Sequence, residues 1–149
     1  MAERTKKREG ETSIIRELLG WIVYIIIIIA LTYLIVTYIG QRTSVQGSSM
    51  ETTLSDGDNL IVDKISYRFR DPSRYDIIVF PYQYEEDTYY IKRIIGLPGE
   101  TVQVKDGAVY INDELLESDI YGREPMNDPG IAAEPITLGE DEYFVLGDN

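Results

Sequence analysis

One long apolar run near the amino terminus dominates the pattern of apolar and polar positions. Residues 18–41 contain no charged side chain over 24 positions, and they include five consecutive isoleucines at 25–29. A helix of that length would extend roughly 36 Å, enough to cross a hydrocarbon core of about 30 Å. Because only a helix satisfies its own backbone groups within lipid, we predict a transmembrane signal-anchor helix over residues 18–40.

The charges beside this run predict its orientation in a lipid bilayer. Five basic residues precede it within the polar residues 1–17, whereas Arg42 alone follows it closely. Basic residues favour the cytoplasmic side, so we expect a cytoplasmic tail over residues 1–17 and an extracytoplasmic domain over residues 41–149. The run is too long for a cleaved signal peptide, which predicts an uncleaved, single-pass anchor in the cell membrane.

After residue 41 the pattern changes to short apolar or alternating runs between turn residues, which is typical of a mostly β domain. Asp106-Gly107 is a strong signal for a type I′ hairpin turn. The polar, proline-containing residues 113–135 predict a long irregular surface excursion. The expected strands cover residues 59–64, 75–80, 88–95, 101–105, 108–112 and 142–146.

The composition excludes several kinds of chemistry. The chain has no cysteine and no histidine, so it lacks a disulfide framework, a thiol nucleophile, and the commonest zinc ligand and general base. A net charge of −12 argues against a nucleic acid partner, because phosphate binding requires a basic surface. A serine nucleophile in this chain would need a lysine or a carboxylate to activate it.

Residues 45–54 are the first candidate for chemistry. They begin shortly after the apolar run, so a hydroxyl there would lie close to a membrane surface on a short tether. Gly47, Ser48 and Ser49 are small enough for another backbone to approach, and Met50 and Leu54 are suited to lining an apolar pocket. The alternative is that a serine in such a loop serves only as a turn or cap residue.

Lys92 is the second candidate, because it interrupts an apolar strand. Alternation along the strand places Tyr90, Lys92 and Ile94 on one face and Arg93 on the other. Burial against apolar neighbours lowers the pKa of lysine far more readily than that of arginine. Lys92 would need its pKa lowered by roughly 3 units to act as a general base near neutral pH. The alternative is that its stem lies along the apolar surface while the ammonium reaches water.

Four segments in order, behind an amino-terminal anchor, resemble the bacterial type I signal peptidases. These are membrane-bound Ser-Lys proteases that remove signal peptides from exported preproteins. Residues 49–54 resemble the family's Ser-Met-x-Pro-Thr-Leu segment, and residues 57–64 resemble the next one. Residues 76–80 with 90–100 resemble the lysine segment, and residues 143–149 resemble the start of the final one.

The resemblance implies a fold, a reaction and a location. It implies an antiparallel-sheet extracytoplasmic domain on one transmembrane helix, without a metal or organic cofactor. Ser49 would be the nucleophile and its backbone N–H an oxyanion donor, while Lys92 would be the general base. The partners would be a lipid bilayer and exported preproteins, bound as an extended strand and cleaved after Ala-x-Ala.

Further roles carry over by position. The residues expected to line shallow substrate pockets are Val45, Met50, Leu54, Tyr90 and Ile91. The residues expected to act as structural supports are Arg93, Gly147 and Asp148.

Three departures from the family pattern bear on activity. Thr52 replaces the usual proline, and Gly47 lacks the hydroxyl that some relatives use as a second oxyanion donor. In the family, Gly-Asp-Asn continues into an arginine and a Ser-x-Asp-Ser-Arg segment that braces the catalytic lysine. The sequence stops at Asn149, so we expect either a fragment truncated at its C-terminal end, which we favour, or a natural truncation. As written, we expect the chain to fold poorly and to cleave weakly or not at all.

Two other functions stay open at this point. The first is a non-catalytic relative that binds exported chains or assists surface-protein assembly. The second is a self-cleaving Ser-Lys protease like some cytosolic repressors, against which the long apolar run argues.

Overall fold

The computed structural model describes residues 2–85, 87–116, 122 and 125–149, with side chains described from residue 14 onward. The chain divides into two compact units, Met1–Gln41 with Asp63–Ile65, and Arg42–Val62 with Ser66–Asn149.

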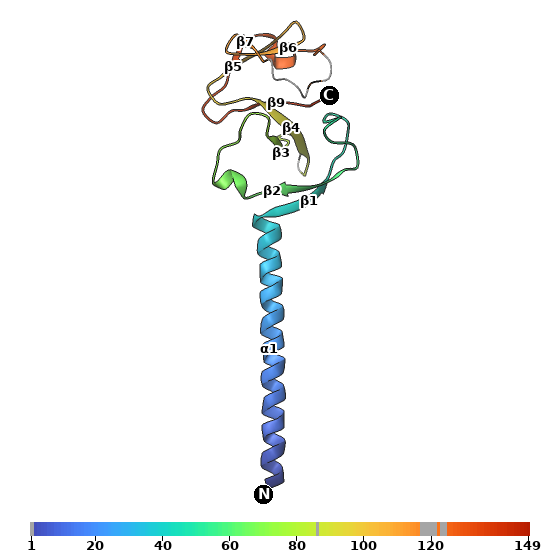
Figure 1. The fold of residues 1–149 in the computed structure, drawn as a ribbon, viewed down its shortest axis with the longest axis vertical. Coiled ribbons are helices and arrows are strands. Elements are labelled where there is room, and N and C mark those ends of the chain that lie inside the picture. The colour runs from blue at the N-terminus through green and yellow to red at the C-terminus, as the bar shows by residue number, and fades with distance from the viewer. Residues whose placement is uncertain (1, 86, 117–121, 123–124) are drawn as a thin grey trace. The chain divides into compact units, whose positions relative to one another are not determined.

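The first unit consists mainly of helix α1 (Ala2–Tyr38), labelled in Figure 1. Its segment Ile14–Tyr38 is long and apolar enough to cross a membrane, and none of it is buried. The predicted helix is therefore present, but it begins earlier and ends sooner than expected. The polar residues before the run extend it, because alanine, glutamate, lysine and arginine all favour helix. Residues 40 and 41 instead belong to a strand.

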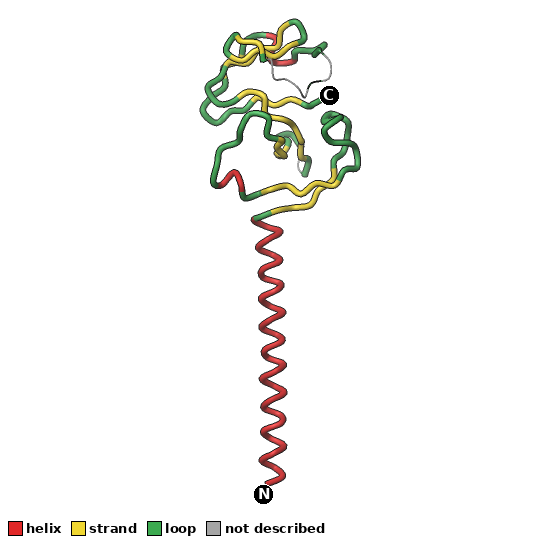
Figure 2. Tube along the Cα trace, viewed as in Figure 1, coloured by secondary structure: helices red, strands yellow, loops and turns green. Residues whose placement is uncertain are grey.

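The second unit is mostly β, and short strands are joined by long loops (Figure 2). Strands β1 (Gly40–Ser44) and β2 (Asn59–Asp63) form a two-stranded sheet on either side of residues 45–58. A short 3-10 helix, η1 (Ser66–Arg68), follows β2.

A three-stranded antiparallel sheet contains the lysine strand. Its order is β3 (Ile77–Pro81), β4 (Tyr89–Gly96) and β9 (Phe144–Leu146), as Figure 1 shows. Strand β3 pairs with the first half of β4, and β9 pairs only with its last residues, from Arg93 onward. Among the described residues, therefore, no strand covers the β9-side edge of β4 before Arg93.

A four-stranded antiparallel sheet supplies the core. Its order is β7 (Glu114–Leu115), β6 (Ala108–Ile111), β5 (Thr101–Lys105) and β8 (Ile136–Thr137), and a second 3-10 helix, η2 (Gly130–Ala133), precedes β8. Alternate residues of β5 and β6 point inward, so Val102, Val104 and Val109 are buried. They pack with Ile95, Ile111, Ala132, Leu138 and Phe144.

Two glycines show how tightly this core and its hairpin are built. A Cβ on Gly96 would lie 2.5 Å from Cγ2 of Val102, so the core excludes any side chain there. At the β5–β6 turn, Asp106 and Gly107 have φ values of 53° and 77°. Positive φ at both central residues is the geometry of a type I′ turn, as predicted.

The sequence predicted the fold class correctly, since the described strand pairs are antiparallel and a single apolar helix precedes them. The six predicted strands are present within three residues at each end. Strands β1, β7 and β8 were not predicted, because their few residues lack an alternating pattern. The predicted irregular excursion over 113–135 contains β7 and η2, and its residues 117–121, 123 and 124 lie outside the described part.

Candidate functional site

Ser49 lies on a loop that is fixed at its base. Within residues 45–58, the backbone N–H of Val45 donates to the Asp58 carbonyl over 2.8 Å, and that of Gly57 donates to the Val45 carbonyl over 3.0 Å. The Val45 and Met50 side chains are buried, with 4% and 1% of their surface exposed. Because these apolar anchors flank it, the hydroxyl of Ser49 is held at the surface.

Lys92 reaches Ser49 from β4. Lys92 lies opposite Ile78 of β3, in the part of β4 that has no partner on its β9 side among the described residues. Its Nζ lies 2.6 Å from the Ser49 Oγ, so the two groups share a hydrogen bond across 43 residues of sequence. An amine and a hydroxyl at this distance can exchange a proton directly.

The surroundings favour the uncharged form of this amine. Burial of Lys92 lowers its pKa from the ordinary value, and the negative charge of Asp148 opposes that shift only partly. The net effect is a lowered pKa, so a larger fraction of Lys92 is neutral at a given pH than in water.

A buried ion pair lies next to Lys92. The Nε of Arg93 donates to Asp148 Oδ1 over 2.8 Å, and its Nη2 donates to Oδ2 over 2.6 Å. The two residues are 4% and 3% exposed. Burial alone would raise the pKa of Asp148, but hydrogen bonds from Arg93 and Thr53, and the nearby positive charges, lower it overall. Asp148 therefore keeps its charge inside the protein.

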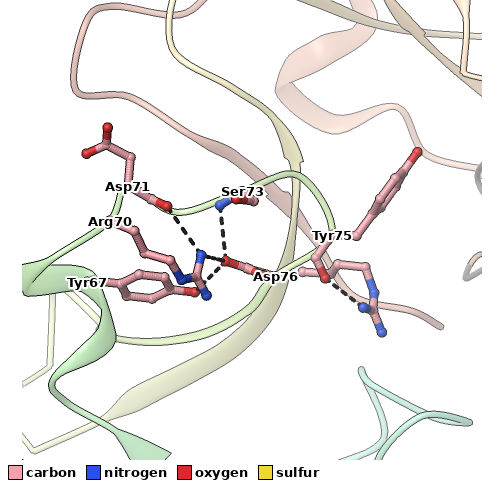
Figure 3. Close-up of polar contacts among 7 residues, drawn as sticks. Tyr67, Arg70, Asp71, Ser73, Tyr75 and Asp76 are labelled. Atoms are coloured by element: carbon pink, nitrogen blue, oxygen red, sulfur yellow. Dashed lines mark hydrogen bonds and ion pairs between the residues drawn. The ribbon is translucent and has the colours of Figure 1, made fainter.

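The far end of Arg93 is held by the segment before β3. Its Nη1 donates to the Tyr75 carbonyl over 2.9 Å. The neighbouring Asp76 carboxylate accepts hydrogen bonds from Tyr67, Arg70 and the Ser73 backbone, as Figure 3 shows. Burial would raise the pKa of Asp76, but these donors lower it overall. This surface network lies next to the turn that presents the Tyr75 carbonyl.

The residues after β9 close the site from the other side. The backbone N–H of Asn149 donates to the Ser49 carbonyl over 3.2 Å, and its side-chain amide donates to the Ser48 carbonyl over 3.2 Å. A Cβ on Gly147 would overlap the Ser49 carbonyl oxygen and lie 3.4 Å from Lys92 Nζ. The close approach of these two backbone segments therefore requires glycine at position 147.

A cleft of about 370 Å³ lies beside Ser49 and Lys92. Three of the predicted pocket residues, Val45, Tyr90 and Ile91, line it. Met50 lies under the loop in the interior and Leu54 lies outside the lining, so neither contributes to this cleft. The cleft lining is mixed, because apolar side chains such as Val45, Leu60 and Ile91 lie beside polar and charged ones.

Most of the residues that meet around Ser49 and Lys92 were also predicted from the sequence. Ser49, Lys92, Arg93, Gly147 and Asp148 form one contiguous group. Thr53 was not singled out, although its hydroxyl donates to Asp148 Oδ2. Leu60 and Val79 of the cleft were also missed. Thr53 could have been found from its place in the serine segment, but nothing local indicates that Leu60 and Val79 face the cleft.

The sequence is similar to those of a known protein family. The sequence model of the family described as "Signal peptidase, peptidase S26" matches residues 18–149. A probable signal peptidase I-2 from Synechocystis sp. is 41% identical over 119 residues, covering 76% of this chain and 52% of that protein. The signal peptidase I of Bacillus licheniformis is 35% identical over 151 residues, covering 95% of this chain and 78% of that protein.

A solved structure, a signal peptidase I from Enterococcus faecalis, is 33% identical. It aligns with a TM-score of 0.39 over 54% of this chain and 79% of that one. The chain spans about half the length of the Synechocystis relative, at 52%.

Proposed function

Because the chain belongs to the signal peptidase family, peptidase S26, we propose that it is a serine endopeptidase that removes signal peptides from exported preproteins. The observation that carries this proposal is the hydrogen bond of 2.6 Å between Lys92 Nζ and Ser49 Oγ. A serine hydroxyl is a weak nucleophile until a base removes its proton, and Lys92 is the base within reach.

The reaction begins with a neutral Lys92. Its amine takes the proton of Ser49 as Oγ attacks the scissile carbonyl, and the resulting ammonium then gives that proton to the leaving amine of the mature protein. The signal peptide is left as an ester on Ser49 Oγ. Water attacks this ester, gives a proton to Lys92, and releases the carboxylic acid, after which Lys92 returns the proton to Ser49.

The backbone N–H of Ser49 is the oxyanion donor in this proposal. A donor already aimed at the developing negative charge stabilises the tetrahedral intermediate without reorganisation. Asp148 and Arg93 act on Lys92 by position, because their buried pair lies beneath it and Gly147 lies against Ser49.

The substrate binds in an extended form along the uncovered edge of β4. Residues 89–92 pair with β3 on one side, whereas β9 begins to pair only at Arg93. An added strand satisfies its backbone groups on such an edge, and alternate side chains enter the adjoining pockets. The cleft walls of Val45, Tyr90 and Ile91 leave room for small side chains, which accounts for a preference for Ala-x-Ala.

Helix α1 provides the membrane anchor. Its apolar segment Ile14–Tyr38 has no buried face, and an unpacked apolar surface of this extent is unfavourable in water. The basic residues before it favour a cytoplasmic amino terminus, which would leave the β domain outside in a single-pass arrangement.

Preprotein processing in liposomes tests this function. The protein, expressed from its complete coding sequence, is compared with Ser49→Ala and Lys92→Ala at matched folded concentration. We expect cleavage after Ala-x-Ala by the parent and a loss of at least about 10³-fold in both variants. A variant that cleaves as well as the parent would refute the residue roles. A well-folded parent that binds preproteins without cleaving them would favour a non-catalytic binding role instead.

A further inference from the structure

The cleft beside Ser49 also carries a negative charge. Asp87 and Lys92 are the two charged residues of the described cleft lining, and the rest of that lining is uncharged. Asp87 is exposed, lies in the turn before β4, and has a φ of 64°. In the described part of the chain its carboxylate has no hydrogen-bond or ion-pair partner, so it is available to a bound chain.

A second cavity, here called the hairpin-tip hollow, adjoins the cleft at Asp87. It measures about 340 Å³ and lies in the β3–β4 turn, lined by Tyr82, Tyr84, Glu85, Asp87 and Tyr89 among others. Asp87 and Tyr89 line both cavities, so the cleft and the hollow adjoin at these two residues.

Stacked rings hold the hollow in shape. The rings of Tyr82 and Tyr90 stack with their centroids 4.6 Å apart, and Tyr84 meets Tyr82 edge-on at 5.5 Å. The backbone N–H of Tyr82 donates to the Thr88 carbonyl over 2.8 Å, which closes the turn. Aromatic faces beside free carboxylates favour organic cations, through ring quadrupoles and charge together.

The geometry sets the position of such a cation on the substrate. The proposed function assigns Tyr90 and Ile91 to the small-residue pockets. Both lie on the Asp87 side of Lys92 in the sequence of β4, so in that function the signal-peptide side of the substrate runs toward Asp87. From Lys92 to Tyr89 an extended strand covers about 10 Å, and Asp87 lies two residues further. A bound extended chain advances about 3.3 Å per residue, which brings its fourth to sixth residue before the scissile bond to Asp87.

We propose that Asp87 and the tyrosines of the hairpin-tip hollow form a subsite for a lysine or arginine side chain, four to six residues before the scissile bond of the substrate. The subsite rests on the proposed function, since it adds a specificity element to the same cleft. It favours basic substrate residues at these positions and disfavours acidic ones, which Asp87 repels.

Three series of matched preproteins test the subsite. Each series carries lysine, glutamine or glutamate at one position, four, five or six residues before the cleavage site. The kcat/KM values are measured for the parent, for Asp87→Asn, and for Asp141→Asn, which removes an exposed carboxylate outside both cavities. At one or more positions, we expect the kcat/KM of the parent to be on the order of tenfold higher for the lysine substrate than for the glutamate substrate. Asp141→Asn should keep this lysine-to-glutamate ratio. In Asp87→Asn the ratio falls below about threefold, and high salt reduces it in the parent.

The subsite would be overturned if the parent's lysine-to-glutamate ratio of kcat/KM stayed below about twofold at all three positions. It would also be overturned if Asp87→Asn kept the parent's ratio. Equilibrium binding of the same preproteins to Ser49→Ala gives a second readout that does not require cleavage. If the parent fails to cleave but Ser49→Ala binds the lysine form more tightly, the subsite stands and the proposed function falls. If Ser49→Ala binds all forms equally, the subsite is refuted whatever the parent cleaves.

Discussion

The two larger sheets of the β domain share one apolar core but differ in the charged groups that they bury. In the sheet of β5, β6, β7 and β8, the buried side chains are apolar, and burial of that surface accounts for its stability. The sheet of β3, β4 and β9 adds Ile95 and Phe144 to that core, but the described part of the chain also buries a charged pair there, Arg93 of β4 with Asp148 just after β9. A buried ion pair contributes less to stability than well-packed apolar residues of similar volume. The difference indicates that the first sheet holds the domain together, and that the second holds a reactive group in place.

Removing Lys92 and shortening a core residue should separate these two roles most clearly. We expect Lys92→Met to lower processing by more than about 10³-fold with little change in the free energy of unfolding, because only the amine is lost. Ile111→Ala in β6 should instead lower the unfolding free energy by about 2–4 kcal/mol while the folded protein stays active. Denaturant titrations and processing rates on both variants check this, and a reversed pattern would contradict the division of roles.

Breaking the buried ion pair should affect both stability and activity. Asp148→Ala leaves Arg93 buried without its carboxylate, which costs about 3–5 kcal/mol of unfolding free energy. Processing should fall as well, because the support beneath Lys92 is lost. Asp76→Ala gives the matched, more exposed case, since its partner Arg70 is half exposed, and we expect a much smaller loss of stability there. Equal losses of unfolding free energy in the two variants would show that the buried pair contributes no more to stability than the exposed one.

Adding one methyl group at the site should have an intermediate effect. Gly147→Ala forces its Cβ into the Ser49 carbonyl, so the Ser49 loop must move away from Lys92. We expect processing to fall by about 10- to 100-fold, as displacements near 1 Å do in other active sites. Gly139→Ala is the control, because its Cβ would meet only the flexible side chain of Glu142 at 3.2 Å. Parent-like cleavage by Gly147→Ala would show that the close backbone approach is dispensable.

The lowered pKa of Asp148 predicts an acid-sensitive contribution to stability. A carboxyl whose pKa is lower in the folded than in the unfolded protein stabilises the fold at pH values above the unfolded pKa, here 3.8. That contribution is lost as the pH falls from about this value through the folded pKa. The parent should therefore lose more stability between pH 5 and pH 2 than Asp148→Asn, measured by denaturant midpoints at each pH. Parallel curves for the two proteins would contradict the assignment.

The smallest effect is expected at the surface network of Figure 3. Arg70 lies 5.0 Å from the centre of the Tyr67 ring and pairs with Asp76 at 2.9 Å, but its side chain is half exposed. Arg70→Ala should leave the denaturation midpoint within experimental error and change processing little. A large loss of processing in this variant would show that the turn presenting the Tyr75 carbonyl depends on this pair.

The sequence predicts the sheet of β5 and β6 better than it predicts the surroundings of Lys92. The β5–β6 hairpin follows from alternating valines around Asp106-Gly107, because both signals are local. The apolar run likewise predicts most of α1. The interior position of Met50 and the hydrogen bond from Arg93 to the Tyr75 carbonyl could not be predicted, because they depend on which distant segments pack together. Ser49 and Lys92, 43 residues apart, were paired by resemblance to a family rather than by any local pattern.

The protonation of Lys92 tests the central claim most directly. The chain contains five lysines, so isotope labelling at lysine Cε gives few signals, and Lys92→Arg identifies the signal of Lys92. An NMR titration of the parent in detergent micelles then follows Lys92 with pH. We predict a midpoint below the ordinary lysine value of 10.5, and processing that rises with pH through that same midpoint. A midpoint at or above 10.5 in an enzyme fully active near neutral pH would contradict a neutral Lys92 as the base that activates Ser49.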